Sequence, residues 1–326
     1  MRRLSLGSAR SLQSLGALLL MVLALSFATP KFLTVVNQLN ILRQISVNLC
    51  LSIGLTLVIL AGGIDLSVGA VLALSGAVAA GLLKSGLAFP TWGFELQFTV
   101  FGAVASGVLV GALAGLANAL VITRLLLPPF VATLAMLSIA RGLTFLWTGG
   151  FPITGLDPAF NALGSGFVLG IPLPVWIVAL LTVVASLLTT QTPFGRHLYA
   201  VGGSERAAYL TGLSVNKIKI WVYVLAGALS ALAGVIVTAR LDSAQPNAGL
   251  GYELDGIAAV VIGGTSLSGG QGSVWGTVLG CLIIGVLNNG LALLDVSPFW
   301  QQVIKGVVII LAVTLDRWGA RQERLT

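Results

Sequence analysis

The stretch GGIDLSVGA, Gly62 to Ala70, decides how this chain must fold. It lies in an apolar run from Ile45 to Leu83 in which Asp65 is the only charged residue. As a single helix this run would be about 58 Å long, nearly twice the hydrocarbon thickness of a bilayer. The run must therefore bend, and its paired glycines weaken a helix. We predict a break here, with Asp65 or Ser67 capping the next helix by accepting from its free N–H groups.

The composition indicates an integral membrane protein. Of the 326 residues, 57% are hydrophobic and only 8% are charged, and the mean hydropathy is +1.03. Soluble domains have about 25% charged residues, so a soluble fold of this length could not cover its surface. No Pro/Ser-rich linker or charge block divides the chain. We therefore expect residues 1–326 to form a single polytopic, all-α membrane domain.

The apolar segments predict about ten transmembrane helices. The eighth segment is too short to cross a bilayer alone at 1.5 Å per residue, so it continues through the glycine-rich GGTSLSGGQGS or is a half-span. The first segment follows arginines, as in a signal peptide, but with so many spans downstream we expect a retained helix. The segments are Leu12–Thr29, Ile45–Gly62, Leu66–Leu83, Phe98–Thr123, Phe130–Trp147, Leu173–Thr190, Ile220–Ala239, Gly256–Thr265, Val274–Leu294 and Phe299–Leu315.

The net charge of +7 follows the positive-inside pattern rather than indicating nucleic-acid binding, because most basic residues lie in short loops and tails. This bias predicts that both termini are cytoplasmic and that the number of crossings is even. The predicted inner residues are Arg2, Arg3, Arg10, Arg124, Arg196, Arg206, Lys217, Lys219, Arg317, Arg321 and Arg324, and the outer ones are Lys31, Arg43, Lys84 and Arg240.

Two cations fall within the predicted spans, where a charge is unfavourable unless it is paired or reaches the interface. We expect Arg141 to pair with Asp255 or Glu253. We expect Lys305 to extend its ammonium group along its apolar stem toward the membrane surface.

A second stretch, YELDGIAAVVIGG, resembles the first, because Asp255 precedes an apolar half-helix as Asp65 does. One aspartate opens the third span and the other opens the eighth span from the opposite side. This relation predicts an inverted repeat of spans 2–5 and 7–10, which is typical of transporters. The candidate residues of the two helix breaks are Gly63, Asp65, Ser67, Asp255, Gly263 and Gly264.

The longest basic loop, residues 191–219, contains a predicted short helix with the sequence ERAAYLT. Ser204 suits its N-cap, Glu205 its first turn and Gly212 its C-terminal stop. A helix of about two turns is marginal alone in water and needs a surface to pack on. It rests on its own membrane domain or docks a cytoplasmic subunit. The candidate docking residues are Ser204, Glu205, Ala207, Ala208, Leu210 and Gly212.

The sequence holds no ATPase signature. None of its lysines stands in a G-x-x-x-x-G-K-[ST] phosphate-binding loop, and the glycine-rich GGTSLSGGQGS contains no lysine. It also has no H-E-x-x-H, no G-x-S-x-G and no cluster of metal ligands. We therefore expect no catalytic residues, no metal and no cofactor in this chain, and another chain would have to bind any ATP and Mg²⁺.

Four long stretches carry a family resemblance. They are LTLVILAGGIDLSVGAVLALSGAVAAG, PPFVATLAML, GRHLYAVGGSERAAYLTGLSVNKIKI and SAQPNAGLGYELDGIAAVVIGGTSLSGGQGSVWGTVLG. The chain strongly resembles the permease subunits of bacterial ribose-type, or monosaccharide, ABC importers from about Leu39 to Asp316. The resemblance implies a fold similar to a type II ABC importer, a location in the bacterial inner membrane and a homodimer.

The same resemblance implies two further partners, a sugar ATPase subunit inside and a periplasmic sugar-binding protein outside. It implies that the 191–219 loop is a coupling loop, with Ser204 to Gly212 facing the ATPase. Ribose or a related pentose is the expected cargo. Relatives with nearly the same motifs carry xylose, arabinose, galactose-type sugars or autoinducer-2, so the identity of the sugar stays open.

Three asparagines in apolar segments are candidate pathway residues: Asn118, Asn288 and Asn289. Their amides could bond sugar hydroxyls, or they could hold neighbouring helices together. The alternative to an ATP-driven permease is an ion-coupled secondary sugar transporter, in which Asp65 and Asp255 bind the cation or proton. An intramembrane enzyme has no pair of catalytic groups at a usable spacing to support it.

Overall fold

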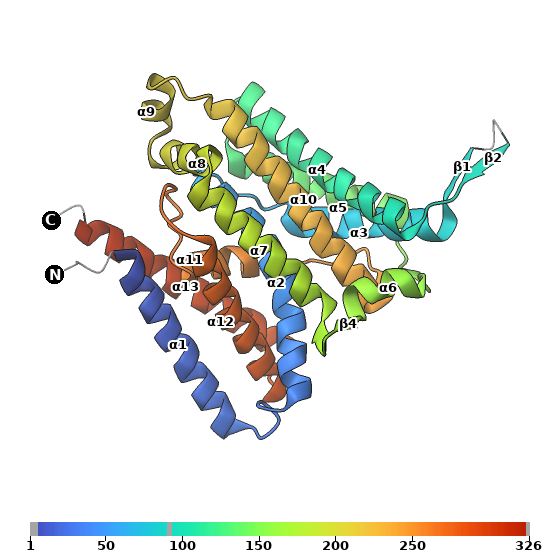
Figure 1. The fold of residues 1–326 in the computed structure, drawn as a ribbon, viewed down its shortest axis with the longest axis horizontal. Helices are drawn as coiled ribbons and strands as arrows, with labels where there is room; N and C mark the ends of the chain where they lie inside the picture. Colours follow the sequence, from blue (N-terminus) through green and yellow to red (C-terminus); the bar gives the residue numbers. More distant parts are fainter. Residues whose placement is uncertain (1–5, 90–92, 324–326) are drawn as a thin grey trace.

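The computed structural model describes residues 6–89 and 93–323, which form a bundle of helices (Figure 1). Each predicted apolar segment lies mostly on one helix. These are α1 (Leu6–Ala28), α2 (Val35–Leu60), α3 (Val68–Ser85), α4 (Val100–Arg124), α5 (Pro129–Thr148), α7 (Leu173–Gln191), α10 (Val215–Leu241), α11 (Tyr252–Ile262), α12 (Val274–Leu293) and α13 (Pro298–Glu323).

The connections contain further short elements. Figure 1 shows α8 (Pro193–Gly203) and α9 (Glu205–Leu210) at the upper left, and the hairpin of β1 (Leu87–Phe89) and β2 (Phe94–Leu96) projecting at the right. The others are α6 (Pro158–Ser165), the antiparallel pair β3 (Ile153–Thr154) with β6 (Ser243–Ala244), and the pair β4 (Phe167–Val168) with β5 (Ile171–Pro172). The all-α prediction therefore holds for the long helices but misses these strands, which pair the backbone groups of the loops.

Among the described residues, seven helices are long and apolar enough to cross a membrane: α2, α3, α4, α5, α7, α10 and α12. In α2 and α3, 78% of the most apolar window is buried, against 28%, 22% and 28% in α4, α5 and α7. The first two therefore form the centre of the bundle, and the last three lie at its edge. Arg2, Arg3 and Arg324, on which the orientation partly rests, lie outside the described residues.

Helix α2 begins ten residues before its predicted start, at Val35 rather than Ile45. Thr34 is its N-cap and accepts a hydrogen bond from the Asn37 backbone N–H. The amides of Asn37 and Gln38 both donate to the Phe32 carbonyl oxygen, at 2.9 and 2.7 Å. The apolar pattern missed this polar first part, whose amides are satisfied by the nearby Phe32 carbonyl and by Asn289 of α12.

Close helix packing depends on small residues. Helix α10 packs against α2, α3 and α4, and α2 packs in addition against α7, α11 and α12. Gly111 of α4 faces Gly227 of α10, and a Cβ on either would overlap the backbone of the other. The two helices therefore approach each other through bare backbone, which is a common contact between membrane helices.

Candidate functional site

The predicted break after α2 is present. Gly62 has φ +78°, a conformation that L side chains rarely adopt, and the Gly63 N–H donates to the Val58 carbonyl at 2.9 Å. These two features end the helix. A Cβ on Gly63 would lie 2.5 Å from the Tyr223 hydroxyl, so the second glycine makes room for a side chain of α10. Residues 61–67 form an irregular segment between α2 and α3, and we name it the α2–α3 bend.

Asp65 does not cap α3 as predicted. Its buried Oδ1 accepts hydrogen bonds from the backbone N–H of Ser67 at 2.8 Å and from the Ser67 hydroxyl at 2.6 Å. Ser67 occupies the N-cap position, but its side chain accepts no hydrogen bond from the N–H groups of α3. Asp65 therefore closes a turn ahead of the helix, which is a frequent use of a short carboxylate.

The α2–α3 bend is tied to three other helices. Asn118 of α4 donates from Nδ2 to the Ser67 hydroxyl at 3.0 Å, and Thr133 of α5 donates to the Ile64 carbonyl at 3.2 Å. Tyr223 of α10 lies against it, and its buried hydroxyl has no hydrogen-bond partner in the described part of the chain. Asn118 is therefore an interhelical contact, which is the second of the two roles considered for it.

The second break differs from the first. Asp255 is the fourth residue of α11 rather than a residue before it, and the N-cap is Gly251 with φ +81°. Asp255 Oδ2 forms an ion pair with Lys305 Nζ of α13 at 2.8 Å. The capping role predicted for Asp255 is therefore wrong, and its carboxylate instead joins α11 to α13.

Of the two intramembrane cations, Lys305 departs from the prediction, whereas Arg141 interacts electrostatically with Glu253, one of its two predicted partners. Lys305 is paired rather than extended to the membrane surface. The Nη1 of Arg141 donates to the carbonyl oxygens of Pro246 and Ala248 at 2.7 and 2.8 Å. The loop before α11 offers these carbonyls close to α5, and such free acceptors satisfy a guanidinium well.

The C-terminal end of α11 has the same backbone arrangement as the C-terminal end of α2. Gly263 is its C-cap, Gly264 has φ +88°, and the Thr265 N–H donates to the Val260 carbonyl at 3.1 Å. An irregular loop, residues 263–273, follows before α12. We name it the α11–α12 loop. The predicted glycines Gly263 and Gly264 therefore mark a real helix end.

The pathway asparagines of α12 lie in a different hydrogen-bond group from Asn118. Asn289 is buried and pairs with Asn37 of α2. The Oδ1 of Asn288 is buried and, within the described residues, has no partner. The structure therefore does not gather the three candidate asparagines into one site.

The predicted loop helix is present as α9 and ends one residue before the predicted ERAAYLT. The Ser204 hydroxyl accepts from the Ala207 N–H at 3.2 Å, Gly212 has φ +84°, and the Leu213 N–H donates to the Ala208 carbonyl at 3.1 Å. These are the cap and the stop that the sequence predicts. Lys219 Nζ pairs with the Glu205 carboxylate at 2.7 Å and fastens α9 to α10.

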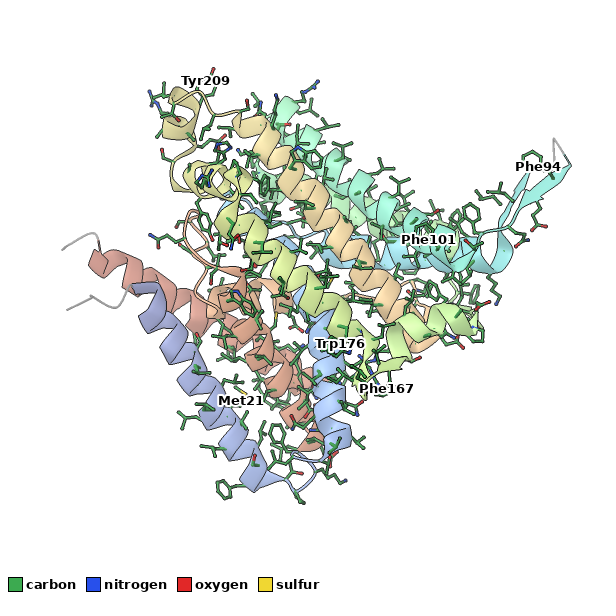
Figure 2. All side chains as sticks on the ribbon, in the orientation of Figure 1. Met21, Phe94, Phe101, Phe167, Trp176 and Tyr209 are labelled. Atoms are coloured by element: carbon green, nitrogen blue, oxygen red, sulfur yellow. The ribbon has the colours of Figure 1, made fainter. Side chains whose placement is uncertain are left out.

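Helix α9 turns an apolar face outward. Ala208 is buried, whereas Tyr209 and Leu210 are 72% and 76% exposed. Figure 2 shows Tyr209 at the tip of α9, away from the body of the bundle. Exposed apolar side chains beside basic residues are typical of an interaction surface.

The sequence pattern did not indicate helix α8. Its N-cap Thr192 accepts from the Gly195 N–H at 3.4 Å, and Pro193 occupies the first helical position. Threonine followed by proline is a recognised helix start and could have indicated it. Among the described residues, no group of three His, Cys, Asp or Glu side chains could hold a metal ion.

The comparisons with known proteins agree on one family. The family model described as "Branched-chain amino acid transport system / permease component" matches residues 37–313. The chain is 51% identical to the ribose import permease protein RbsC of Bacillus subtilis over 311 residues, which are 94% of this chain and 93% of that protein. It is 48% identical to RbsC of Escherichia coli K12, covering 93% of this chain and 92% of that protein.

A more distant relative is also a permease of a sugar transport system. The D-allose transport system permease protein AlsC of Escherichia coli K12 is 39% identical, covering 90% of this chain and 86% of that protein. No solved structure matches this chain. The multi-pass helical fold and these matches together identify a transporter subunit of the inner membrane rather than an enzyme. The chain belongs to the family of ABC-importer membrane permeases that this family model describes.

Proposed function

We propose that this chain forms the translocation pathway of an ATP-driven importer for ribose or a related pentose. The observation that carries this proposal is the identity of about half of all positions to ribose import permeases over nearly the whole length of both chains. The chain itself does no chemistry, and ATP and Mg²⁺ are bound by a separate subunit.

The proposed topology has ten crossings with both termini in the cytoplasm. The α8–α9 end then faces the cytoplasm and carries Arg196, Arg206 and Lys217, in agreement with the positive-inside rule. Helix α11 has 11 residues and is about 16 Å long, so the α11–α12 loop completes the eighth crossing. The exposed edge helices α4, α5 and α7 face lipid or a second copy in a homodimer.

The packing supports an inverted repeat of spans 2–5 and 7–10. In this pairing α2 corresponds to α10, α3 to α11, α4 to α12 and α5 to α13. Helix α10 packs against α3 and α4, and α2 packs against α11 and α12. Likewise α3 packs on α4 and α5, as α11 packs on α12 and α13. The same set of contacts therefore occurs twice, as two related halves that exchange their first helices would produce.

Helix α9 docks the ATPase subunit in this proposal. Its exposed Tyr209 and Leu210 supply apolar contact, and its N-terminal end is held by the Ser204 cap and the Glu205–Lys219 ion pair. A loaded periplasmic binding protein releases sugar at the opposite face. ATP binding and hydrolysis by the partner then move α9 and switch access from outside to inside. The pathway needs little affinity of its own for sugar.

An ion-coupled transporter is the less favoured function. It would need Asp65 and Asp255 free to bind a cation. Asp255 already pairs with Lys305, and the Oδ1 of Asp65 is occupied by two hydrogen bonds from Ser67.

The proposal is tested by reconstituting the permease in vesicles with its ATPase and sugar-loaded binding protein. Uptake should require all three proteins and ATP. Replacing exposed Ala207 and Leu210 together by Asp should abolish uptake and release the ATPase, while the permease still inserts. Phe151→Asp, an exposed change at the opposite end, should leave the ATPase bound. Uptake by the permease alone, driven by an ion gradient, would refute the proposal.

A further inference from the structure

Gly202, near the end of α8, lies against both the end of α2 and the α11–α12 loop. A Cβ on Gly202 would overlap the carbonyl oxygen of Leu60, the last residue of α2, and would lie 2.5 Å from the backbone nitrogen of Gly270. Its neighbour Gly203 is different, because a Cβ there would meet nothing within 4 Å. Glycine is therefore required at position 202 but not at the adjacent position 203 of the same helix.

The α11–α12 loop and the end of α2 are bonded to each other at this point. The Gly270 N–H donates to the Leu60 carbonyl at 3.0 Å. A Cβ on Gly269, which has φ +85°, would lie 3.0 Å from the backbone of Gly62. The end of α2 and the α11–α12 loop therefore contact each other through backbone atoms, next to Gly202 of α8.

A side chain of α8 also reaches this loop. The Tyr199 hydroxyl donates to the Gly272 carbonyl at 2.9 Å. Tyr199 and Gly202 are three residues apart and therefore lie on one face of the helix. Helix α8 therefore contacts the loop at two points, Gly270 and Gly272.

These contacts are stiff. Backbone groups in van der Waals contact have no rotamers that could absorb a displacement, and packed interiors transmit strain. Helix α9 follows α8 directly and packs against it. A movement of α9 is therefore passed to α8 and from there to the end of α2 and the α11–α12 loop.

The loop is a suitable place for a change of access. Irregular backbone at membrane depth is tolerated only where protein covers it or where it lines a water-filled cavity. It links α11, which is too short to span, to α12. A small shift of this loop can therefore open or close one end of the pathway without unfolding a long helix.

We propose that Gly202 and Tyr199 are positioning residues that transmit the movement of α8 and α9 to the α2–α3 bend and the α11–α12 loop. The inference rests on the proposed function and names the route by which the ATPase acts on the pathway. The residues that contact the ATPase and those that carry its movement are then different, and mutation can separate them.

The test compares Gly202→Ala with Gly203→Ala in the three-component vesicle system. Gly202→Ala should bind the ATPase normally, because the exposed face of α9 is unchanged, while sugar uptake falls about tenfold or more. Stimulation of ATP hydrolysis by loaded binding protein should be lost in the same variant. Gly203→Ala should resemble the wild type in all three measurements.

Tyr199→Phe removes only the hydroxyl that bonds Gly272 and keeps the ring packing. It should lower uptake with normal insertion and normal ATPase binding, and it decides the question if Gly202→Ala fails to insert. Wild-type uptake in Tyr199→Phe, or equal uptake in the two glycine variants, would overturn the inference. A wild-type permease that needs no ATPase would instead refute the proposed function, so the two failures are distinguishable.

Discussion

Asn37 of α2 and Asn289 of α12 hydrogen-bond each other in both directions. Asn37 Nδ2 donates to Asn289 Oδ1 at 3.0 Å, and Asn289 Nδ2 donates to Asn37 Oδ1 at 2.9 Å. Both side chains are buried, with exposed fractions of 8% and 7%. Paired amides satisfy each other where water is excluded, so they fix how α2 and α12 align.

Replacing Asn289 by Ala should lower the free energy of unfolding by about 1–2 kcal/mol, because it leaves the Asn37 amide buried and partly unpaired. Asn288→Ala is the matched control, since the Oδ1 of Asn288 bonds nothing in the described chain. Thermal unfolding in detergent should separate the two variants. Equal midpoints would mean that the Asn37–Asn289 pair contributes no stability. A complete loss of uptake in stable Asn289→Ala would instead assign this amide to the sugar pathway.

Lys305→Met should destabilise the permease by about 3–5 kcal/mol, because it leaves the carboxylate of Asp255 buried without its ion-pair partner. The side chains of Lys305 and Asp255 are 26% and 8% exposed, so solvent screens the pair only in part. Adding Asp255→Asn should restore much of the loss. Gln302→Met, an exposed change in the same helix, is the control. If the single and double variants unfold alike, the pair is not responsible for the loss.

Asp65→Asn should reduce stability only modestly. The amide keeps an oxygen that can accept from the Ser67 N–H and hydroxyl, although without the strength of a charged acceptor. Asp65→Ala removes the acceptor and should be much less stable. The measurement is the thermal midpoint together with uptake at matched expression. Loss of all uptake in a stably inserted Asp65→Asn would show that the carboxylate takes part in transport directly.

Asp242 should make the loop around α6 sensitive to acid. It follows α10, is exposed, and its Oδ1 accepts from Asn161 Nδ2 and from the Leu156 N–H, each at 2.8 Å. These hydrogen bonds, that of Asn161 first, lower the pKa of Asp242 below its ordinary 3.8. The ionised carboxylate therefore stabilises the loop fully above the ordinary pKa of 3.8. This stabilisation is lost as the pH falls through the lowered pKa of the folded state.

Hydrogen exchange at Leu156 should report this change. Its amide should exchange faster as the pH falls through the lowered pKa of Asp242, after correction for intrinsic exchange. In Asp242→Asn the protection should be weaker at neutral pH and should not change over that acidic range. An unchanged acid response in Asp242→Asn would remove Asp242 as the cause.

Cysteine labelling should test the orientation. The native Cys50 and Cys281 are buried and should react little. A cysteine at Phe151, which is 77% exposed between α5 and α6, should react with an impermeant reagent added from outside the cell. A cysteine at Tyr209 should react only after the membrane is opened. The reverse pattern would overturn the proposed topology.

The sequence alone determined the features that depend on neighbouring residues. The break at Gly62 and Gly63, the short α11, and the Ser204 cap and Gly212 stop of α9 were all predicted correctly. Each arises within a few residues, because a positive φ favours glycine and a hydroxyl caps its own helix. The family was also evident from continuous stretches of sequence.

Only the tertiary structure decided which distant groups meet. Lys305 binds Asp255, Arg141 binds the carbonyls before α11, and Asn289 binds Asn37, because helix packing brings these groups within hydrogen-bonding distance. No local pattern encodes such distances, since many polar groups in a membrane bundle could satisfy one another equally well. The contact of Gly202 with Leu60 and Gly270 is of the same kind, since a glycine required by a neighbouring backbone looks in sequence like any other glycine.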